Sequence, residues 1–369
     1  MTESLVVTDP LSVDAARWGD IASGRPMLRL DVLQEFAAER SDGVLLFLLS
    51  DEQGIVCAAV AEPRPSASVV RPVESLLYGR AQPLTDRLGL RGEPYLRVGA
   101  PWGQDSGVML RRGVEGAMIL GRFVDALENW TRDAGMGLVF HAVHEDEKAL
   151  SGLLRERHYL RTKRPSGTLL PVRWRSFEEY RAAMTKRSSR VGETLRAERR
   201  RNRDGGVVIR RTAPSAAQAR ALHGFADHHF RYKNDSDLPY GDGFLERLLP
   251  RLQDDVLLLE AVRDGQCCAM LAVVKSGDTG WAAFFGLDTR DRPNDFTYFN
   301  IVFYALADYA ADFGLRQVLM GNGAYAAKQR RGCELRPAQL FYRPRTALRR
   351  QLLRPVFALH RHWAAGKFT

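Results

Sequence analysis

The sequence lacks the features that would place it in a membrane or in an oxidising compartment. No apolar run approaches the roughly 18 residues that can span a bilayer, and the run VLLFLL at 44–49 has the length of a buried strand. The first ten residues carry acids where a secretory signal carries lysines. The four cysteines show no metal-ligand spacing, and the adjacent Cys267 and Cys268 cannot close an unstrained disulfide. We therefore expect a cytoplasmic, reduced protein that binds no metal.

What the sequence does contain is an uneven distribution of charge. Residues 1–170 hold 20 Lys and Arg against 23 Asp and Glu, whereas the remaining residues hold 34 against 21. The segment 186–211 alone has ten basic and three acidic residues, and no acid follows Glu334. Two interpretations stay open. The second half has either a solvated, arginine-rich surface or a surface for a polyanionic partner, since a one-sided basic field attracts phosphates.

The order of predicted elements occurs twice along the chain. In the first half, two strands at 44–62 and a strand at 93–102 precede an amphipathic helix at 115–135, a strand at 136–143 and a short helix at 146–159. The second half repeats this order with three strands at 255–288, a helix at 296–314, a strand at 315–322 and a short helix at 324–332. The repetition predicts two similar α/β domains.

The domain boundaries follow from this repeat. We expect an N-terminal domain at 1–170, a C-terminal domain at 171–345 and a basic helical tail at 346–369. The tail is amphipathic, and Pro355 predicts that it consists of two helices.

Three passages of the second half carry a family resemblance. They are KRSSRVGETLRAERRRNRDGG at 186–206, FTYFNIVFYALADYAADFGL at 296–315 and GAYAAKQRRGCELRP at 323–337. This half resembles the GNAT-fold acyltransferases of the Fem type, which attach amino acids to peptidoglycan precursors using aminoacyl-tRNA. It is also similar to the related peptidoglycan biosynthesis/recognition domains, some of which serve natural-product pathways. The resemblance covers about residues 174–343 and implies tandem GNAT-like domains, each a mixed central sheet flanked by helices, with a cleft for acyl transfer between them.

The chemistry of amide formation agrees with what the sequence contains. GNAT folds separate two parallel strands and direct backbone N–H groups at a carbonyl or its oxyanion. Binding both substrates together supplies proximity without a covalent intermediate. The sequence has no G-x-S-x-G elbow and no Cys/His signature, which favours direct attack by an amine.

The sequence gives weaker evidence about the acyl donor than about the fold. Acetyl-CoA-dependent GNAT enzymes hold pyrophosphate with a glycine loop before the central helix, and LDTRDRPNDFT at 287–297 has no glycine and three aspartates. RGVEGA at 112–117 comes closer, with Arg112 and Gly116, although its glycine is one place late. We therefore expect aminoacyl-tRNA as the co-substrate, no required cofactor and a small-molecule amine as the acceptor. Acetyl-CoA or another acyl-CoA is the alternative donor.

The stretch GNGAYAAKQRRGCELRP at 321–337 joins glycines to a cationic helix. Gly321 and Gly323 allow backbone conformations that other residues resist, and Lys328 and Arg331 share one helix face. The family resemblance implies that Lys328 lies near the active cleft and contacts a substrate phosphate or the acceptor end of the tRNA. A solvated short helix is the alternative interpretation.

Polar side chains before residue 240 add candidates for proton relay and acceptor binding. His228 or His229 titrates near neutrality and could relay the proton of the amine, although paired histidines are also common on surfaces. Asp235 and Asp237 could anchor a cationic amine, or could shape a turn before Pro239.

The candidate residues form three groups, and none of them is predicted to bind a metal. The catalytic candidates are His228, His229, Asn322, Tyr325 and Lys328. The substrate-binding candidates are Asp235, Asp237, Tyr298, Asn300 and Arg331. The tRNA-binding candidates are Lys186, Arg187, Arg196, Arg199, Arg200, Arg203, Arg330, Arg349 and Arg350, of which the four from 196 to 203 are spaced to form one cationic helix face.

Three functions remain as hypotheses at the level of the sequence. The first is an amide-forming acyltransferase that uses aminoacyl-tRNA and acts on a natural-product intermediate or a cell-wall precursor. The second is an acyl-CoA-dependent N-acyltransferase. The third is a non-catalytic protein that binds nucleic acid or an anionic membrane through its basic segments.

Overall fold

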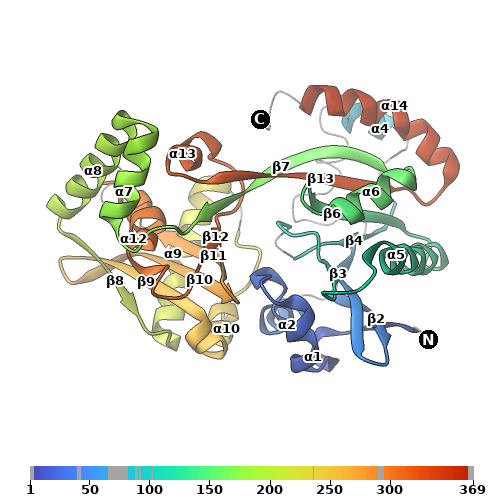
Figure 1. Ribbon diagram of the computed structural model, residues 1–369, viewed down its shortest axis with the longest axis horizontal. Coiled ribbons are helices and arrows are strands. Elements are labelled where there is room, and N and C mark those ends of the chain that lie inside the picture. The colour runs from blue at the N-terminus through green and yellow to red at the C-terminus, as the bar shows by residue number, and fades with distance from the viewer. Residues whose placement is uncertain are drawn as a thin grey trace. The chain divides into compact units, whose positions relative to one another are not determined.

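The computed structural model forms two compact α/β units (Figure 1). It describes residues 4–39, 43–64, 82–87, 90, 93–101, 103–235, 237–288 and 295–364. The first unit consists of 1–22, 27–167 and 336–369, and the second of 23–26 and 168–335.

The first unit is built on a mixed sheet in the order β1-β2-β3-β4-β6-β13, with β5 paired to β3. Its strands are β1 (Ser4–Thr8), β2 (Leu45–Asp51), β3 (Gly54–Arg64), β4 (Tyr95–Val98), β5 (Val108–Leu110), β6 (Gly137–His144) and β13 (Glu334–Arg343). Its helices are α1 (Ala15–Ala22), α2 (Leu30–Glu39), α4 (Gln82–Arg87), α5 (Gly116–Asp133), α6 (Lys148–Glu156) and α14 (Ala347–Ala364). Strands β4 and β6 are parallel and are connected through α5, whose Phe123 and Leu127 are buried against Phe140 and Leu96.

The C-terminal segment departs from the expected organisation. Residues from Arg336 onward belong to the first unit, whereas the sequence assigned residues up to 345 to the second domain. The reason is strand pairing, because Ala338–Arg343 of β13 pairs antiparallel with Leu138–His144 of β6.

The tail is one helix, so the predicted break at Pro355 is wrong. Helix α14 continues through Pro355, although proline withholds one backbone N–H. Leu353, Val356 and Phe357 are buried in one cluster with Tyr342 of β13, and packing on both sides of the proline keeps the helix continuous. Residues 365–369 of the expected tail lie outside the described part of the chain.

The second unit has a mixed sheet in the order β8-β9-β10-β11-β12-β7. Its strands are β8 (Val207–Thr212), β9 (Val256–Arg263), β10 (Gln266–Ser276), β11 (Thr279–Leu287), β12 (Gln317–Leu319) and the end of β7 (Leu160–Pro171), which pairs through Leu169–Pro171. Its helices are α7 (Phe177–Arg187), α8 (Ser189–Asp204), α9 (Ala216–Asn234), α10 (Phe244–Leu252), α11 (Thr297–Phe299), α12 (Ala305–Tyr309) and α13 (Tyr325–Arg330).

Alternating residues of this sheet face two helical layers. Leu257 and Leu259 pack in one core with Ile301 and Phe303 from the central helix. On the other face Phe284 contacts Phe244 of α10, with ring centroids 6.1 Å apart. Helices α7 and α8 lie side by side (Figure 1).

The expected helix at 296–314 is interrupted. A single π-helical turn, η5 (Asn300–Tyr304), separates α11 from α12. Such turns are rare and are frequently found at functional sites. The remaining elements occur in the expected order in both units, and the predicted fold class is confirmed.

Candidate acyl-transfer site of the second unit

Strands β11 and β12 separate in the middle of the second sheet. They pair in parallel only between Thr279–Trp281 and Gln317–Leu319, while β11 continues to Leu287. The register between β10 and β11 also shifts at Ala272/Val273, which bends β11 at the point of separation. Past Trp281, the described residues contain no β12 partner for the backbone of β11. This open edge offers amide groups to a carbonyl oxygen.

An aromatic group lies along the open part of β11. The ring of Phe285 contacts His229 of α9 and Tyr298 of α11, at centroid distances of 5.0 and 5.2 Å. Burial lowers the pKa of His229 to about 4, with Lys233 and His228 adding to the shift, so this imidazole is neutral at pH 7. Its Nδ1 is buried and has no hydrogen-bond partner among the described residues. The structure therefore brings His229 and Tyr298, two of the sequence-predicted residues, to one place.

Lys328 secures the chain that leaves β12. Its Nζ donates to the carbonyl oxygens of Met320, Gly321 and Asn322 at 2.6, 3.1 and 3.3 Å. The side chain is buried, and burial lowers its pKa to about 8. Because the ammonium is directed at the backbone, the expected direct contact with a phosphate gives way to a role in holding this loop.

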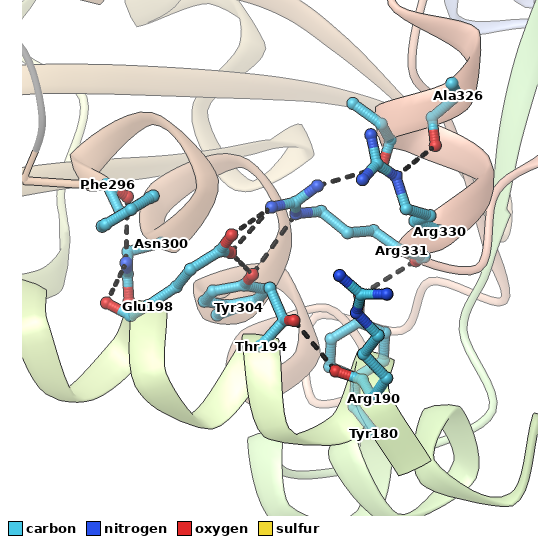
Figure 2. Close-up of polar contacts among 11 residues, drawn as sticks. Tyr180, Arg190, Thr194, Glu198, Phe296, Asn300, Tyr304, Ala326, Arg330 and Arg331 are labelled. Carbon is cyan, nitrogen blue, oxygen red and sulfur yellow. Dashed lines mark hydrogen bonds and ion pairs between the residues drawn. The ribbon is translucent and has the colours of Figure 1, made fainter. Parts of the chain in front are cut away.

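Arg331 is likewise committed to the protein interior (Figure 2). It donates to both carboxylate oxygens of Glu198 at 2.8 and 2.7 Å and, through Nε, to the hydroxyl of Tyr304 at 3.3 Å. Its guanidinium lies 3.4 Å from the ring centre of Phe299. Tyr304 also donates to Glu198, and burial raises the pKa of this phenol, which keeps it protonated. The predicted contact between Arg331 and substrate is thus replaced by a contact between α8, η5 and the end of α13.

Asn300 and Asn202 fix the start of the central helix. Asn300 donates to the carbonyls of Phe296 and Glu198 at 2.9 and 3.3 Å, so its amide group serves the fold (Figure 2). Asn202 donates to Thr297 Oγ1 at 2.9 Å. Asp295 accepts from the backbone N–H of Thr297 at 2.9 Å and forms an ion pair with Arg263. The N-terminus of the helix therefore already holds a carboxylate of the protein itself. Residues 289–294 of the loop before this helix, where CoA-dependent GNAT enzymes bind pyrophosphate, lie outside the described residues.

A groove of about 710 Å³ runs beside α8 and is bordered by β8 and the central helix. All four arginines of the predicted cationic face line it: Arg196, Arg199, Arg200 and Arg203. Arg199 pairs with Asp308 at 2.9 Å and lies 4.1 Å above the ring of Phe177. The other three arginine side chains are exposed.

The remaining predicted residues lie elsewhere. Asp235 ends α9 in a left-handed conformation with φ of 50°, and Asp237 is 3.1 Å from Arg231. Asn322 is exposed in the loop before α13, and Tyr325 begins that helix. His228 is half-buried on α9.

The other basic candidates are scattered. Lys186 and Arg187 end α7, and Arg187 lines a separate cavity of about 430 Å³ with Trp174. Arg330 is exposed and donates to the carbonyl of Ala326 at 3.2 Å. Arg349 and Arg350 are on α14 in the first unit, where Arg349 is 3.3 Å from Glu93.

Sequence reasoning missed Glu198, Tyr304 and Asp308. The available signal for Glu198 was its position, because it is one of three acids in a segment of ten basic residues. An acid surrounded by arginines in the sequence is a candidate for a paired carboxylate, because buried carboxylates are almost always paired.

These elements define the class of the protein. Strands, helices and a separated parallel pair occur in the order typical of GNAT folds, and the chain is a GNAT-fold protein. Residues 187–329 match the family model described as an acetyltransferase (GNAT) domain.

Three solved structures are similar to nearly the whole chain. FemX has a TM-score of 0.59 at 10% identity, over 95% of this chain and 100% of that one. L-PGS from Bacillus licheniformis has a TM-score of 0.57 at 12% identity, over 96% of each chain. A conserved protein of unknown function from Bacteroides thetaiotaomicron has a TM-score of 0.56 at 11% identity, over 92% and 100%. No curated protein sequence matches the chain.

Two classes of site are not observed in the described part of the chain. It has no group of three or more His, Cys, Asp or Glu side chains that could hold a metal ion. None of its described helices is both long enough and apolar enough to cross a bilayer.

Proposed function

We propose that the protein transfers an aminoacyl group from aminoacyl-tRNA to the amine of a small molecule, such as a natural-product intermediate or a cell-wall precursor. The observation that carries the proposal is the separation of β11 and β12, which leaves the backbone of β11 beyond Trp281 open to an acyl carbonyl. Similarity of the fold to FemX and L-PGS, together with the resemblance of the second half to Fem-type acyltransferases, supports the same reaction class.

The start of the central helix favours a tRNA donor over CoA. In the second unit, the helix N-terminus that would receive a pyrophosphate already bonds Asp295. A second anion there would be repelled by this carboxylate. The excess of basic residues in the second half, by contrast, suits a donor with many phosphates.

The proposed reaction is a direct aminolysis of the ester. The neutral amine attacks the carbonyl carbon while β11 amides bond the developing oxyanion. A C–N bond forms, the C–O bond to the ribose breaks, and the amine proton passes to the leaving ribose oxygen. His229 is assigned to relay that proton because its Nδ1 is unpartnered among the described residues and its side chain contacts Phe285 of β11. Lys328 positions the opposite wall through the carbonyls of Met320–Asn322.

The direct test is a transfer assay. Purified protein is incubated with a mixture of radiolabelled aminoacyl-tRNAs and an extract of small metabolites, and labelled amide products are separated from tRNA. We expect label in small molecules, and no product when the tRNA is first digested with RNase. Turnover that survives the digestion contradicts the proposal.

The alternative donor has one structural observation in its favour. In the first unit, Gly113 has a φ of 82° and precedes α5, whose first residue is Gly116 and whose N-cap, Glu115, makes no side-chain cap bond. A loop of this kind can bind phosphate, with Arg112 exposed beside it. Tight binding of acetyl-CoA in calorimetry, lost on substitution of Arg112, would identify an acyl-CoA-dependent N-acyltransferase.

The third hypothesis is a non-catalytic binder of nucleic acid or of an anionic membrane. Its membrane form relied on the amphipathic tail, and the apolar face formed by Leu353, Val356 and Phe357 of α14 is buried within the first unit. Steep salt-dependent binding without a product from any donor would support the nucleic-acid form.

A further inference from the structure

The groove beside α8 is lined by more basic than acidic side chains, and two of its arginines form no ion pair with an acid among the described residues. Arg199 is matched by Asp308 at 2.9 Å, and Glu178, which also lines the groove, is matched by Arg181 at 3.0 Å. Arg203 is 3.8 Å from Asp204. Arg196 and Arg200 have no acidic partner within 4.0 Å among the described residues and are exposed. They are four positions apart on α8, about 6 Å along the helix axis, so both face the same length of groove.

One part of the groove lining, termed its floor, is apolar. It is formed by Val207, Ile209 and Ala305, with the half-buried ring of Tyr309 beside them. Val207 and Ile209 point to the same face of β8, and Ile209 is half-buried, so part of its side chain stays accessible. Cations above an apolar and aromatic floor are the combination that binds single-stranded nucleic acid, because phosphates take the cations while bases stack.

The size of the groove selects between forms of nucleic acid. Its volume of about 710 Å³ falls in the range of roughly 300–1,000 Å³ of small-ligand sites. It can therefore enclose one or two unpaired nucleotides but not a duplex, whose bases are also stacked away from such a floor. A membrane surface is disfavoured, because the apolar residues lie within a hollow and do not form a protruding strip.

We propose that this groove binds the unpaired 3′ end of an RNA, with Arg196 and Arg200 on successive phosphates and a base against Ile209 and Tyr309. The inference deepens the proposed function and depends on it only for the identity of that RNA as the acyl donor. It assigns recognition of the donor to a second place in the same unit, on the helix face of the sheet that carries the central helix.

The test uses the full-length protein and uncharged RNA, so that binding is measured apart from transfer. A labelled RNA hairpin with a 3′ overhang of about four nucleotides is compared with the same hairpin ending bluntly, by fluorescence anisotropy at fixed salt. We expect the overhang to tighten binding about tenfold or more. The R196Q/R200Q variant should lose about tenfold for the overhang RNA, with the slope of log affinity against log salt reduced by about two.

A charge-matched control separates this site from general electrostatics. R220Q/R316Q removes the same net charge from exposed positions of the same unit, outside the groove. It should change the affinity for overhang RNA by less than about twofold. Equal losses in the two variants, or equal affinity for blunt and overhang RNA, would overturn the proposal.

Further outcomes distinguish the groove from the reaction. If no transfer is found with any charged tRNA but the groove variant still loses overhang binding, the proposed function fails and the groove proposal stands. If transfer depends on tRNA but R196Q/R200Q leaves both KM for tRNA and overhang affinity unchanged, the groove proposal fails. Loss of binding to phosphatidylglycerol vesicles without loss of RNA binding also overturns it.

Discussion

Glu198 and Arg331 form a buried ion pair inside the second unit, in which Nη2 of Arg331 lies within 3 Å of both carboxylate oxygens. The pair joins α8, which lines the cationic groove, to the end of α13. Helix α13 contains Lys328 and directly follows the loop after β12. The carbonyl of Arg331 also accepts from the hydroxyl of Tyr180 at 2.9 Å. The groove and the proposed acyl-transfer site are therefore connected by one buried polar cluster.

This pair predicts a large stability effect from a single truncation. Glu198→Ala leaves the Arg331 guanidinium buried without its carboxylate, and we expect a loss of about 3–5 kcal/mol in the free energy of unfolding. The double variant E198L/R331M should recover part of that loss because it removes both charges. Urea unfolding measures both effects. As the control, Glu178→Gln breaks an exposed pair with Arg181 and should cost less than about 1 kcal/mol. An equally mild E198A would show that the pair is not important for stability.

Lys328 predicts a pH dependence of stability. Its pKa is lowered to about 8 in the folded protein from a model-compound value of 10.5. Between these values the unfolded chain binds the proton and the folded chain does not, so the free energy of unfolding rises with pH across the window. The difference in unfolding free energy between wild type and Lys328→Met should therefore shift in favour of the wild type from pH 8 to pH 10, by at most about 3 kcal/mol. Parallel curves over this range would contradict the lowered pKa.

The same substitution tests the positioning role of Lys328. Without Nζ, the carbonyls of Met320, Gly321 and Asn322 lose a shared donor. We expect Lys328→Met to lower kcat by about tenfold or more while KM for tRNA changes little, since the lysine does not reach the groove. A rise in KM for tRNA with unchanged kcat would instead indicate that Lys328 contacts a phosphate of the tRNA directly.

His229 predicts a pH effect on the acid side. The pKa of His229 falls from 6.5 to about 4 on folding. Between pH 4 and pH 6.5, His229 is therefore protonated in the unfolded chain and neutral in the folded chain. Stability conferred by the neutral imidazole is present above pH 6.5 and is lost as the pH falls towards 4. His229→Phe should flatten that part of the stability curve and reduce transfer at pH 7, whereas His228→Gln should change neither by a comparable amount. A similar acid slope in H229F would remove His229 as its cause.

The fold class could be predicted from the sequence because the helix and strand patterns are local and occur twice. Glycine-ended helices and apolar strands such as 255–288 recur in the same order in both halves, and they fold as that order predicts. The exact partners of buried polar groups could not be predicted, since they depend on contacts between residues far apart. Arg331 and Glu198 are 133 positions apart, so no local pattern in the sequence indicates that they pair. Lys328 is a second example, because nothing local in the sequence shows that its ammonium donates to carbonyls of its own backbone.

The proline in α14 illustrates a different limit. Pro355 is a reliable local signal for a helix break, and it was overridden by burial of Leu353, Val356 and Phe357. The sequence of the tail alone does not show this packing, because the residues that contact it belong to other elements. Tyr342 is on β13, and other members of the cluster, such as Leu90 and Val139, lie more than 200 positions earlier in the chain.

Donor selection supplies the last prediction. Asp295 occupies the start of the central helix, bonding the N–H of Thr297 and pairing with Arg263. We expect no acetyl-CoA binding to the wild type in calorimetry, and no effect of Arg112→Ala or Gly116→Ala on transfer from charged tRNA. Asp295→Asn keeps a side-chain acceptor for the cap and removes the repelling charge, so it should cost about 1 kcal/mol or more in stability without weakening tRNA-dependent transfer beyond that loss. Acetyl-CoA binding by the wild type that disappears in R112A would place the donor in the first unit, and the reaction would then be that of an acyl-CoA-dependent transferase.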